Sequence, residues 1–283
     1  MASFTNFATL SYNGGTTNSN IVTGEILEAL TAVKTAVSAN YSAGDRITYA
    51  LSLVNTGTAA ITDYTVTDNL GGYTVGANTV YPLAYNAGTV RYYINGVLQA
   101  APTVTAGPPL TVTGLTVPAG GSAVLIYETT ATPVAPLATG SSITNTATIT
   151  GAGLTTPITA QATVETANSA DLTISKALSP TTVTENGQIT YTFVISNTGN
   201  TEATATGNVV VTDTFAPILR NIAVTYNGTA WTEGTNYTYN AATGVFTTLA
   251  GQITVPAASF TQNTDGTFTV TPGTATLVIT GTI

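Results

Sequence analysis

Residues 32–58 read AVKTAVSANYSAGDRITYALSLVNTGT, and residues 174–200 read ISKALSPTTVTENGQITYTFVISNTGN. The two segments align without a gap and share a lysine, the triplet ITY and the ending NTG. Ahead of the second ITY, Leu172, Ile174 and Leu178 alternate with other residues as in a β-strand. The spacing over 24–37 alone would also fit an amphipathic helix, but the repeat predicts a strand in the first copy too.

The repeat extends beyond these segments. TVTDNL (65–70) corresponds to VVTDTF (210–215), and VPAGGSAVLIYETTAT (117–132) corresponds to VTPGTATLVITGTI (270–283). Short alternating runs rich in Val, Thr, Ile and Tyr, separated by Gly and Asn turns, are typical of a sandwich. The predicted fold is therefore all-β, with two Ig-like antiparallel β-sandwich domains over residues 29–168 and 169–283.

The first copy continues into a final hairpin, SSITNTATITGAGLTTPITAQATVE (141–165), that the second copy lacks. A relative of this hairpin stands at the other end of the chain, because SFTNFATL (3–10) matches SITNTATI (142–149). We therefore expect residues 1–28 to form a donor hairpin and the second domain to lack its closing hairpin. The inward face of the donor strand is predicted to carry Phe4, Asn6, Ala8 and Leu10.

A sandwich without its last strands exposes apolar surface and unpaired backbone groups, and an isolated hairpin is marginal in water. Docking the hairpin into the incomplete domain solves both problems by β-strand addition. Self-closure of one chain is an alternative, but the short connection between hairpin and following strand favours the second domain of another subunit. A head-to-tail contact of this kind builds an open filament, with the protein itself as partner.

Composition narrows the function. The chain has 43% hydrophobic and 6% charged residues and a net charge of −8. So few basic residues make nucleic acid and anionic membranes poor partners, and no apolar run is long enough for membrane insertion. The absence of Cys and His removes most metal, cofactor and nucleophile systems, so we expect no cofactor, no metal and no enzyme beyond autocatalytic cross-linking.

The two lysines of the chain, Lys34 and Lys176, occupy the same position in the two copies. Strand parity places each on the inward face, together with Asp68 or Asp213. The same parity turns Asn145 inward in the first domain and Asn6 inward on the donor strand. Each completed domain is thus expected to bury a lysine, an aspartate and an asparagine.

One use of such a trio is autocatalytic amide formation between lysine and asparagine with loss of ammonia. Desolvation favours the neutral, nucleophilic amine, and a nearby carboxyl can polarise the amide and carry protons. This hypothesis predicts a Lys34–Asn145 bond assisted by Asp68, and a Lys176–Asn6 bond between subunits assisted by Asp213. Two alternatives stay open: a buried ion pair with asparagine as hydrogen-bond partner, or lysines that face solvent.

The motifs NTG, VTD, the VPAGG turn and ITNTATIT resemble a conserved Gram-positive bacterial surface repeat domain of unknown function. The resemblance implies an Ig-like fold and an extracellular setting, and some members are similar to isopeptide-forming pilin and adhesin modules. Neither terminus shows a secretory signal or wall-sorting tail, which favours a spore-surface appendage as well as the cell surface. The functional expectation is a pilus-like fibre subunit; the alternative is a monomeric or anchored adhesin that binds a host ligand or glycan.

Overall fold

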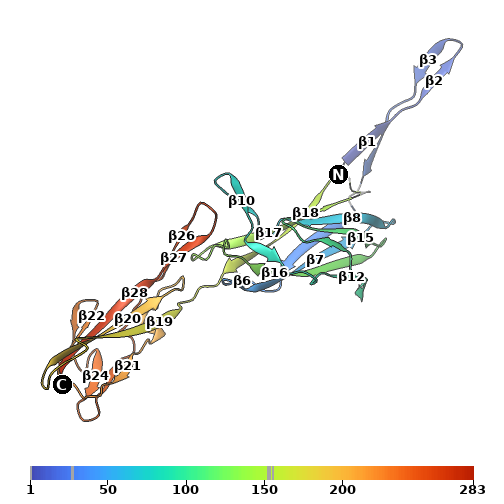
Figure 1. Cartoon of the computed structure of the whole chain (residues 1–283). Coiled ribbons are helices and arrows are strands. Elements are labelled where there is room, and N and C mark those ends of the chain that lie inside the picture. The colour runs from blue at the N-terminus through green and yellow to red at the C-terminus, as the bar shows by residue number, and fades with distance from the viewer. Residues whose placement is uncertain (1, 27–28, 152–153, 155) are drawn as a thin grey trace. The chain divides into compact units, whose positions relative to one another are not determined.

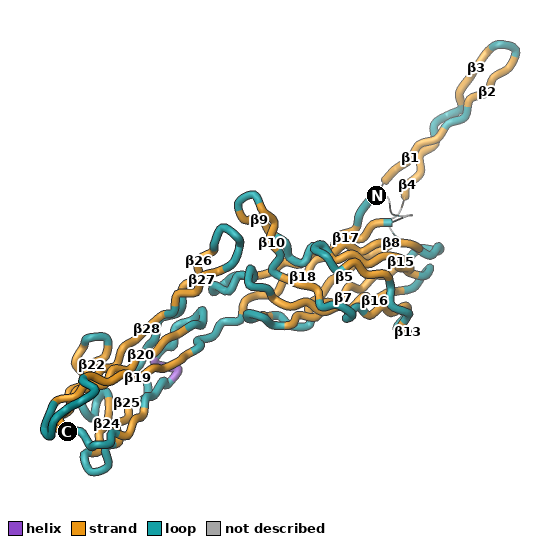
Figure 2. Tube along the Cα trace, in the orientation of Figure 1, coloured by secondary structure: helices purple, strands orange, loops and turns teal. Residues whose placement is uncertain are grey.

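The computed structural model describes residues 2–26, 29–151, 154 and 156–283. These residues form strands and turns, with a single short 3-10 turn, η1 (Ala205–Gly207), among them. They divide into two compact units (Figures 1 and 2). The first holds the residues up to Pro136 together with Ser142–Glu165, and the second holds Leu137–Ser141 with Thr166–Ile283. The prediction of an all-β chain with several antiparallel sheets is confirmed.

The first unit is built on two six-stranded sheets. One follows the order β13-β12-β16-β7-β5, with β11 also paired to β16; its strands are β5 (Leu30–Ala36), β7 (Arg46–Asn55), β11 (Leu83–Tyr85), β12 (Arg91–Ile94), β13 (Val97–Leu98) and β16 (Ser122–Ala131). The other follows the order β14-β15-β8-β17-β18-β6, with β6 (Asn40–Tyr41), β8 (Ile61–Asp68), β14 (Thr103–Thr105), β15 (Leu110–Val117), β17 (Ser142–Thr150) and β18 (Ile158–Thr166). A small hairpin joins β9 (Tyr73–Val75) to β10 (Asn78–Val80).

Buried and exposed side chains alternate along the strands, and the buried ones form the core between these two sheets. In RITYALSLVN of β7, every second side chain from Ile47 to Leu53 is buried, and β16 alternates in the same way. Tyr92 on β12 donates its hydroxyl to the carbonyl of Thr116 on β15, so the sheets contact each other face to face. β5 is a strand, as the repeat predicts, and the helical interpretation of 24–37 is wrong for the described residues.

The N-terminal segment is a long two-stranded ribbon, coloured blue in Figure 1. Its lower part pairs β1 (Ala2–Asn6) with β4 (Val22–Ile26), and its upper part pairs β2 (Thr9–Tyr12) with β3 (Gly15–Asn18). Its large apolar side chains are exposed, including Phe4 at 54% and Leu10 at 62%. Residues 27–28, the end of the expected donor hairpin, lie outside the described residues.

The second unit repeats the β13-β12-β16-β7-β5 sheet of the first. Its order is β19-β20-β28-β22-β23, with β19 (Leu172–Ser179), β20 (Gln188–Asn197), β22 (Arg220–Tyr226), β23 (Thr229–Trp231) and β28 (Gly273–Thr282). A three-stranded sheet holds β21 (Thr212–Thr214), β24 (Tyr237–Asn240) and β25 (Val245–Thr248), and a hairpin joins β26 (Ser259–Gln262) to β27 (Phe268–Thr271). Side chains of these sheets share one core that includes Phe193, Phe215, Phe246 and Leu277.

The repeated asparagine of the NTG motif has the same structural role in both units. Asn55 donates to the carbonyls of Ala59 at 2.8 Å and Pro118 at 3.0 Å. Asn197 donates to those of Thr201 at 2.7 Å and Pro256 at 3.0 Å. Val255-Pro256-Ala257 therefore corresponds to the VPA turn of the first unit, which corrects the sequence alignment to residues 270–273. The β26–β27 hairpin is an insertion between that turn and β28.

The smaller sheet of the second unit differs from its counterpart. In the first unit β8 lies between β15 and β17. Its counterpart β21, which carries the repeated VTD motif, pairs with β25 on one side, and no strand of the described residues pairs with its other side. Ile174, Leu178 and Val210 are exposed apolar side chains of this unit.

Candidate functional site

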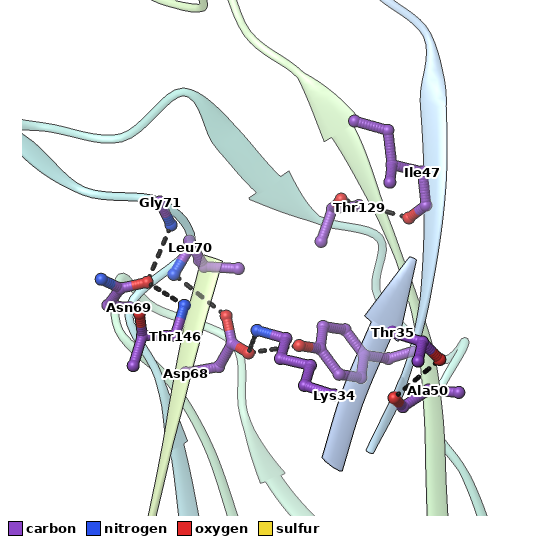
Figure 3. A network of polar contacts seen from close by, with 11 residues as sticks. Lys34, Thr35, Ile47, Ala50, Asp68, Asn69, Leu70, Gly71, Thr129 and Thr146 are labelled. Carbon is purple, nitrogen blue, oxygen red and sulfur yellow. Dashed lines mark hydrogen bonds and ion pairs between the residues drawn. The ribbon is translucent and has the colours of Figure 1, made fainter. Parts of the chain in front are cut away.

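A buried lysine–aspartate pair links the two sheets of the first unit. Lys34 lies on β5, where residues Leu30 and Lys34 are the inward positions of the strand. Asp68 is the last residue of β8 in the facing sheet. The Nζ atom of Lys34 lies 2.5 Å from Oδ2 of Asp68, and the two side chains are 0% and 1% exposed (Figure 3).

Both oxygens of the Asp68 carboxylate accept hydrogen bonds. Oδ2 accepts from Lys34 and from the hydroxyl of Tyr127 on β16, and Oδ1 accepts from the backbone N–H of Leu70 at 3.0 Å. The turn that follows β8 thus holds the carboxylate from one side (Figure 3). Charged groups in a dry interior need partners of this kind, because an unpaired buried charge costs several kcal/mol.

Asn145 is the third member of the cluster. It lies on β17, two residues before Ala147, which is paired with Asp68. Residues at this diagonal share a face of the sheet and have nearby Cβ atoms. Asn145 is 0% exposed, yet neither its Nδ2 nor its Oδ1 atom has a hydrogen-bond partner among the described residues. An unsatisfied buried amide costs about 1–3 kcal/mol per group, so its presence calls for a reason.

Two tyrosines enclose the trio. The Nζ atom of Lys34 lies 4.9 Å from the ring centroid of Tyr49 and 5.9 Å from that of Tyr127. Burial raises the pKa of Tyr127, and the charge of Asp68 adds to this, whereas the amide of Asn145 opposes it. Burial also raises the pKa of Tyr49, and the amide of Asn145 again opposes this rise. The amide group therefore lies beside both hydroxyls, although it is not in hydrogen-bonding geometry with either.

Burial also changes the chemistry of the amine. Desolvation lowers the pKa of Lys34 from 10.5 to about 8, and the charge and hydrogen bond of Asp68 only partly offset it. At pH 7 the neutral fraction of the amine rises from about 1 in 3,000 to about 1 in 10. A neutral amine is a nucleophile, and the adjacent carboxylate can accept the proton that the ammonium gives up. The site can therefore present a nucleophile, a proton carrier and an amide electrophile to one another.

The second unit holds the equivalent ion pair in a different environment. Nζ of Lys176 on β19 lies 2.5 Å from Oδ2 of Asp213 on β21. The amine stands over the rings of Tyr191, Phe193 and Phe215, with centroid distances of 4.7, 5.4 and 5.4 Å. The two charged side chains are 39% and 18% exposed. In the single chain this lysine is partly exposed, and no strand of the described residues covers the β21 edge beside it. Its expected burial concerns the domain completed by a donor strand and stays a prediction.

The remaining site residues lie on the N-terminal ribbon of the first unit. Phe4, Asn6, Ala8 and Leu10 are all exposed there. The structure thus brings together Lys34, Asp68 and Asn145 in one place and Lys176 and Asp213 in another, and leaves Asn6 at the surface.

The sequence reasoning missed the two tyrosines around Lys34. Tyr49 belongs to the repeated ITY motif, and its parity matches that of buried Ile47 and Leu51, so the pattern contained a signal for it. Tyr127 has no counterpart in the repeat, since Ile279 is paired with Tyr191 as Tyr127 is with Tyr49. No local pattern marks its hydroxyl as a partner of Asp68.

Within the residues that the structure describes, no group of three or more Asp and Glu side chains is placed to hold a metal ion. The same part of the chain contains no helix that is long and apolar enough to cross a membrane.

No family model matches the chain, and no curated protein matches it. Several solved structures do match it. BcpA, the major pilin subunit of Bacillus cereus, aligns with 96% of this chain and 73% of its own, at 15% identity and a TM-score of 0.36. The pilus backbone protein RrgB of Streptococcus pneumoniae aligns with 86% of this chain and 55% of its own, at 14% identity and a TM-score of 0.36. The N-terminal domain of the Streptococcus gordonii adhesin Sgo0707 aligns with 47% of this chain and 31% of its own, at 15% identity and a TM-score of 0.35.

The chain therefore spans about half of the RrgB structure and about a third of the Sgo0707 structure. In fold, this protein is similar to pilin and adhesin modules of bacterial surfaces, at low identity.

Proposed function

We propose that this protein is the structural subunit of an extracellular fibre on a bacterial cell or spore surface, and that it polymerises head to tail. The N-terminal ribbon of one subunit adds strands to the second unit of the next, beside β21. Lys–Asn amide bonds then reinforce the fibre, Lys34–Asn145 within the first unit and Lys176–Asn6 between subunits, with Asp68 and Asp213 as the assisting carboxyls.

The observation that carries this proposal is the pairing register of the ribbon. Ser3 is paired with Glu25 and Asn6 with Val22. In the first unit Ser142 is paired with Glu165 and Asn145 with Ala162. Over residues 3–6 the ribbon thus repeats the start of the β17–β18 hairpin, with a serine opposite a glutamate and an asparagine opposite an apolar residue. Beyond Asn6 the register of the ribbon shifts by one residue, since Leu10 is paired with Thr17, whereas β17 and β18 stay in one register.

The unpaired strand edge of the second unit and the exposed apolar side chains of the ribbon support the same conclusion. β17 of the first unit pairs with β8 from Thr65 to Asp68, whereas the shorter counterpart β21 pairs only with β25 and has no strand partner on its other side among the described residues. The ribbon exposes Phe4 and Leu10, while their counterparts Ile143 and Ile149 are 2% and 0% exposed. Burying such side chains contributes about 1.5–3 kcal/mol each, which favours docking.

Head-to-tail addition follows from how each hairpin connects to the chain. The β17–β18 hairpin completes the unit that precedes β19, the strand into which it leads. By analogy the ribbon, which leads into β5, completes a unit that precedes β5, and this is the second unit of another subunit. A contact of this kind repeats without closing and yields a filament.

The experiment compares two neighbouring substitutions on the donor strand. Phe4→Asp places a charge on the inward face, and Thr5→Asp places the same charge on the outward face of the same strand. We expect Thr5→Asp chains to form filaments in negative-stain electron microscopy and Phe4→Asp chains to remain single subunits in sedimentation. Filaments of normal length from Phe4→Asp would contradict donor-strand assembly.

The amide bonds are tested separately on the assembled protein. A boiled denaturing gel of wild-type filaments should show a ladder of multimers, and monomeric Phe4→Asp should have an intact mass one ammonia below the calculated value. The full calculated mass in this variant would contradict the Lys34–Asn145 bond. A single monomer band from filaments would contradict the bond between subunits.

A further inference from the structure

The two lysine–aspartate pairs of this chain have the same geometry and opposite exposure. Each amine lies 2.5 Å from one carboxylate oxygen. The side chains of Lys34 and Asp68 are 0% and 1% exposed, whereas those of Lys176 and Asp213 are 39% and 18% exposed. Water that reaches the second pair stabilises the charged forms of both groups, and a charged ammonium is not a nucleophile.

Within the described part of the chain, the strand that covers the first pair has no counterpart over the second. In the first unit β17 brings Ala147 opposite Asp68 and Ile149 opposite Val66, both buried. The same strand carries Asn145, so one element both shields the ion pair and supplies the amide. Among the described residues no strand lies at this position beside β21.

We propose that docking of the ribbon of a second copy of this chain activates the cross-linking centre of the second unit, because the ribbon buries Lys176 and Asp213 as it delivers Asn6. This inference rests on the proposed function. It adds that the bond between subunits cannot form before assembly, since the free subunit lacks both the amide and the dry environment.

The register of the docked ribbon follows from the first unit. Transfer of the Ala147–Asp68 and Ile149–Val66 pairs places Ala8 opposite Asp213 and Leu10 opposite Val211. Asn6 then lies diagonally from Asp213, as Asn145 does from Asp68. The aromatic rings under Lys176 already form the floor of the centre, so the docked strand has only to close its open side.

The reaction in the closed centre balances without an external reagent. The ammonium of Lys176 passes one proton to Asp213, and the neutral amine attacks Cγ of Asn6. The Nζ–Cγ bond forms, Asp213 shuttles the second proton from Nζ to Nδ2, and the Cγ–Nδ2 bond breaks to release ammonia. The carboxyl proton leaves with the departing ammonia or to water, so the net change is one amine and one amide converted to a substituted amide and ammonia.

The chain offers a direct test because it contains only two lysines. Limited acetylation with an amine-reactive ester, followed by peptide mass mapping, compares Lys176 with Lys34 in the same sample. The free state is the Phe4→Asp chain, and the docked but unlinked state is filaments of Asn6→Ala, which keep the apolar donor face. Should Asn6→Ala not assemble, wild-type filaments sampled before ladder bands form provide that state.

We expect Lys176 to react readily in the free chain and at least about tenfold more slowly in docked filaments, where reaction needs local opening. Lys34 should stay protected in both states. Acetylation of Lys176 at the free-chain rate in docked filaments would overturn this inference and leave donor-strand assembly standing. Failure of the wild-type chain to form filaments would instead remove the proposed function itself.

Discussion

Replacing Asn145 by alanine removes the electrophile and leaves Lys34 buried beside Asp68 as a permanent ionisable pair. The pKa of Lys34 is about 8 in the folded chain and 10.5 as its ordinary value, taken here for the unfolded chain. Between these values the unfolded state binds more protons than the folded state, so stability rises with pH. Below about pH 8 the amine is protonated in both states, and this gain is absent.

The size of the effect follows from the two pKa values. Between about pH 7 and about pH 9.5 the free energy of unfolding of the first unit should rise by about 2 kcal/mol. Near the upper limit the tyrosines of the unfolded chain begin to ionise, since their ordinary pKa is about 10. Burial raises the pKa of Tyr41 to about 12 and that of Tyr127 as well, so each such tyrosine offsets only about 0.2 kcal/mol of the rise at about pH 9.5. Ionisation of tyrosine would destabilise the folded state at higher pH and mask the signal.

The assay is guanidinium unfolding at several pH values, followed by circular dichroism. The single tryptophan, Trp231, lies in the second unit, so its fluorescence identifies that unit's transition. The control is Asn145→Ala combined with Lys34→Met and Asp68→Asn, which keeps Tyr49 and Tyr127 but has no amine or carboxyl at the site and should show no such rise. A stability that is flat or falls over this range in Asn145→Ala would refute the desolvated amine.

Three further outcomes follow from the same contacts. Asp68→Ala leaves the buried amine without its acceptor, so intact mass should stay at the full calculated value and the first unit should lose about 3 kcal/mol or more in denaturant unfolding; a mass short by one ammonia would argue against the role of the carboxyl. Gly24→Val places a Cβ atom 2.4 Å from Cζ of Phe4, so filaments seen by electron microscopy should decline. Adding Phe4→Ile, which recreates the Ile–Val pairing of the first unit, should restore them, and no recovery would contradict the proposed equivalence. Asn55→Ala removes the side-chain hydrogen bonds to Ala59 and Pro118. It should lower the free energy of unfolding by about 1–3 kcal/mol in thermal or denaturant unfolding, whereas an unchanged stability would show that the VPA turn does not need these bonds.

The repeat made much of the fold predictable, because strands depend on local alternation that two copies report independently. The segment 24–37 is ambiguous alone, and comparison with 172–178 resolves it in favour of a strand, as β5 shows. Period-two parity also identified the inward positions of Lys34, Asp68 and Asn145, since successive side chains of a strand point to opposite faces. These inferences need no knowledge of which strands meet.

Other features depend on contacts between distant segments and were not predictable in this way. The alignment of the VPA turn to 270–273 was wrong because the β26–β27 insertion breaks the spacing, and only the hydrogen bonds of Asn55 and Asn197 locate the true counterpart. Parity placed Lys176 on the inward face, but parity does not give its degree of burial, which depends on a covering strand that is absent among the described residues of the single chain.

The amino-acid sequence by itself determined the all-β class, the duplication and the identity of the residues that face inward, because each of these is encoded in short-range patterns. The tertiary structure decided that Lys34 and Asp68 meet across two sheets and that the Tyr127 hydroxyl joins them. It also decided that the pKa of the amine falls to about 8. Desolvation depends on everything packed around a group, and that packing exists only when strands far apart in the sequence close over it.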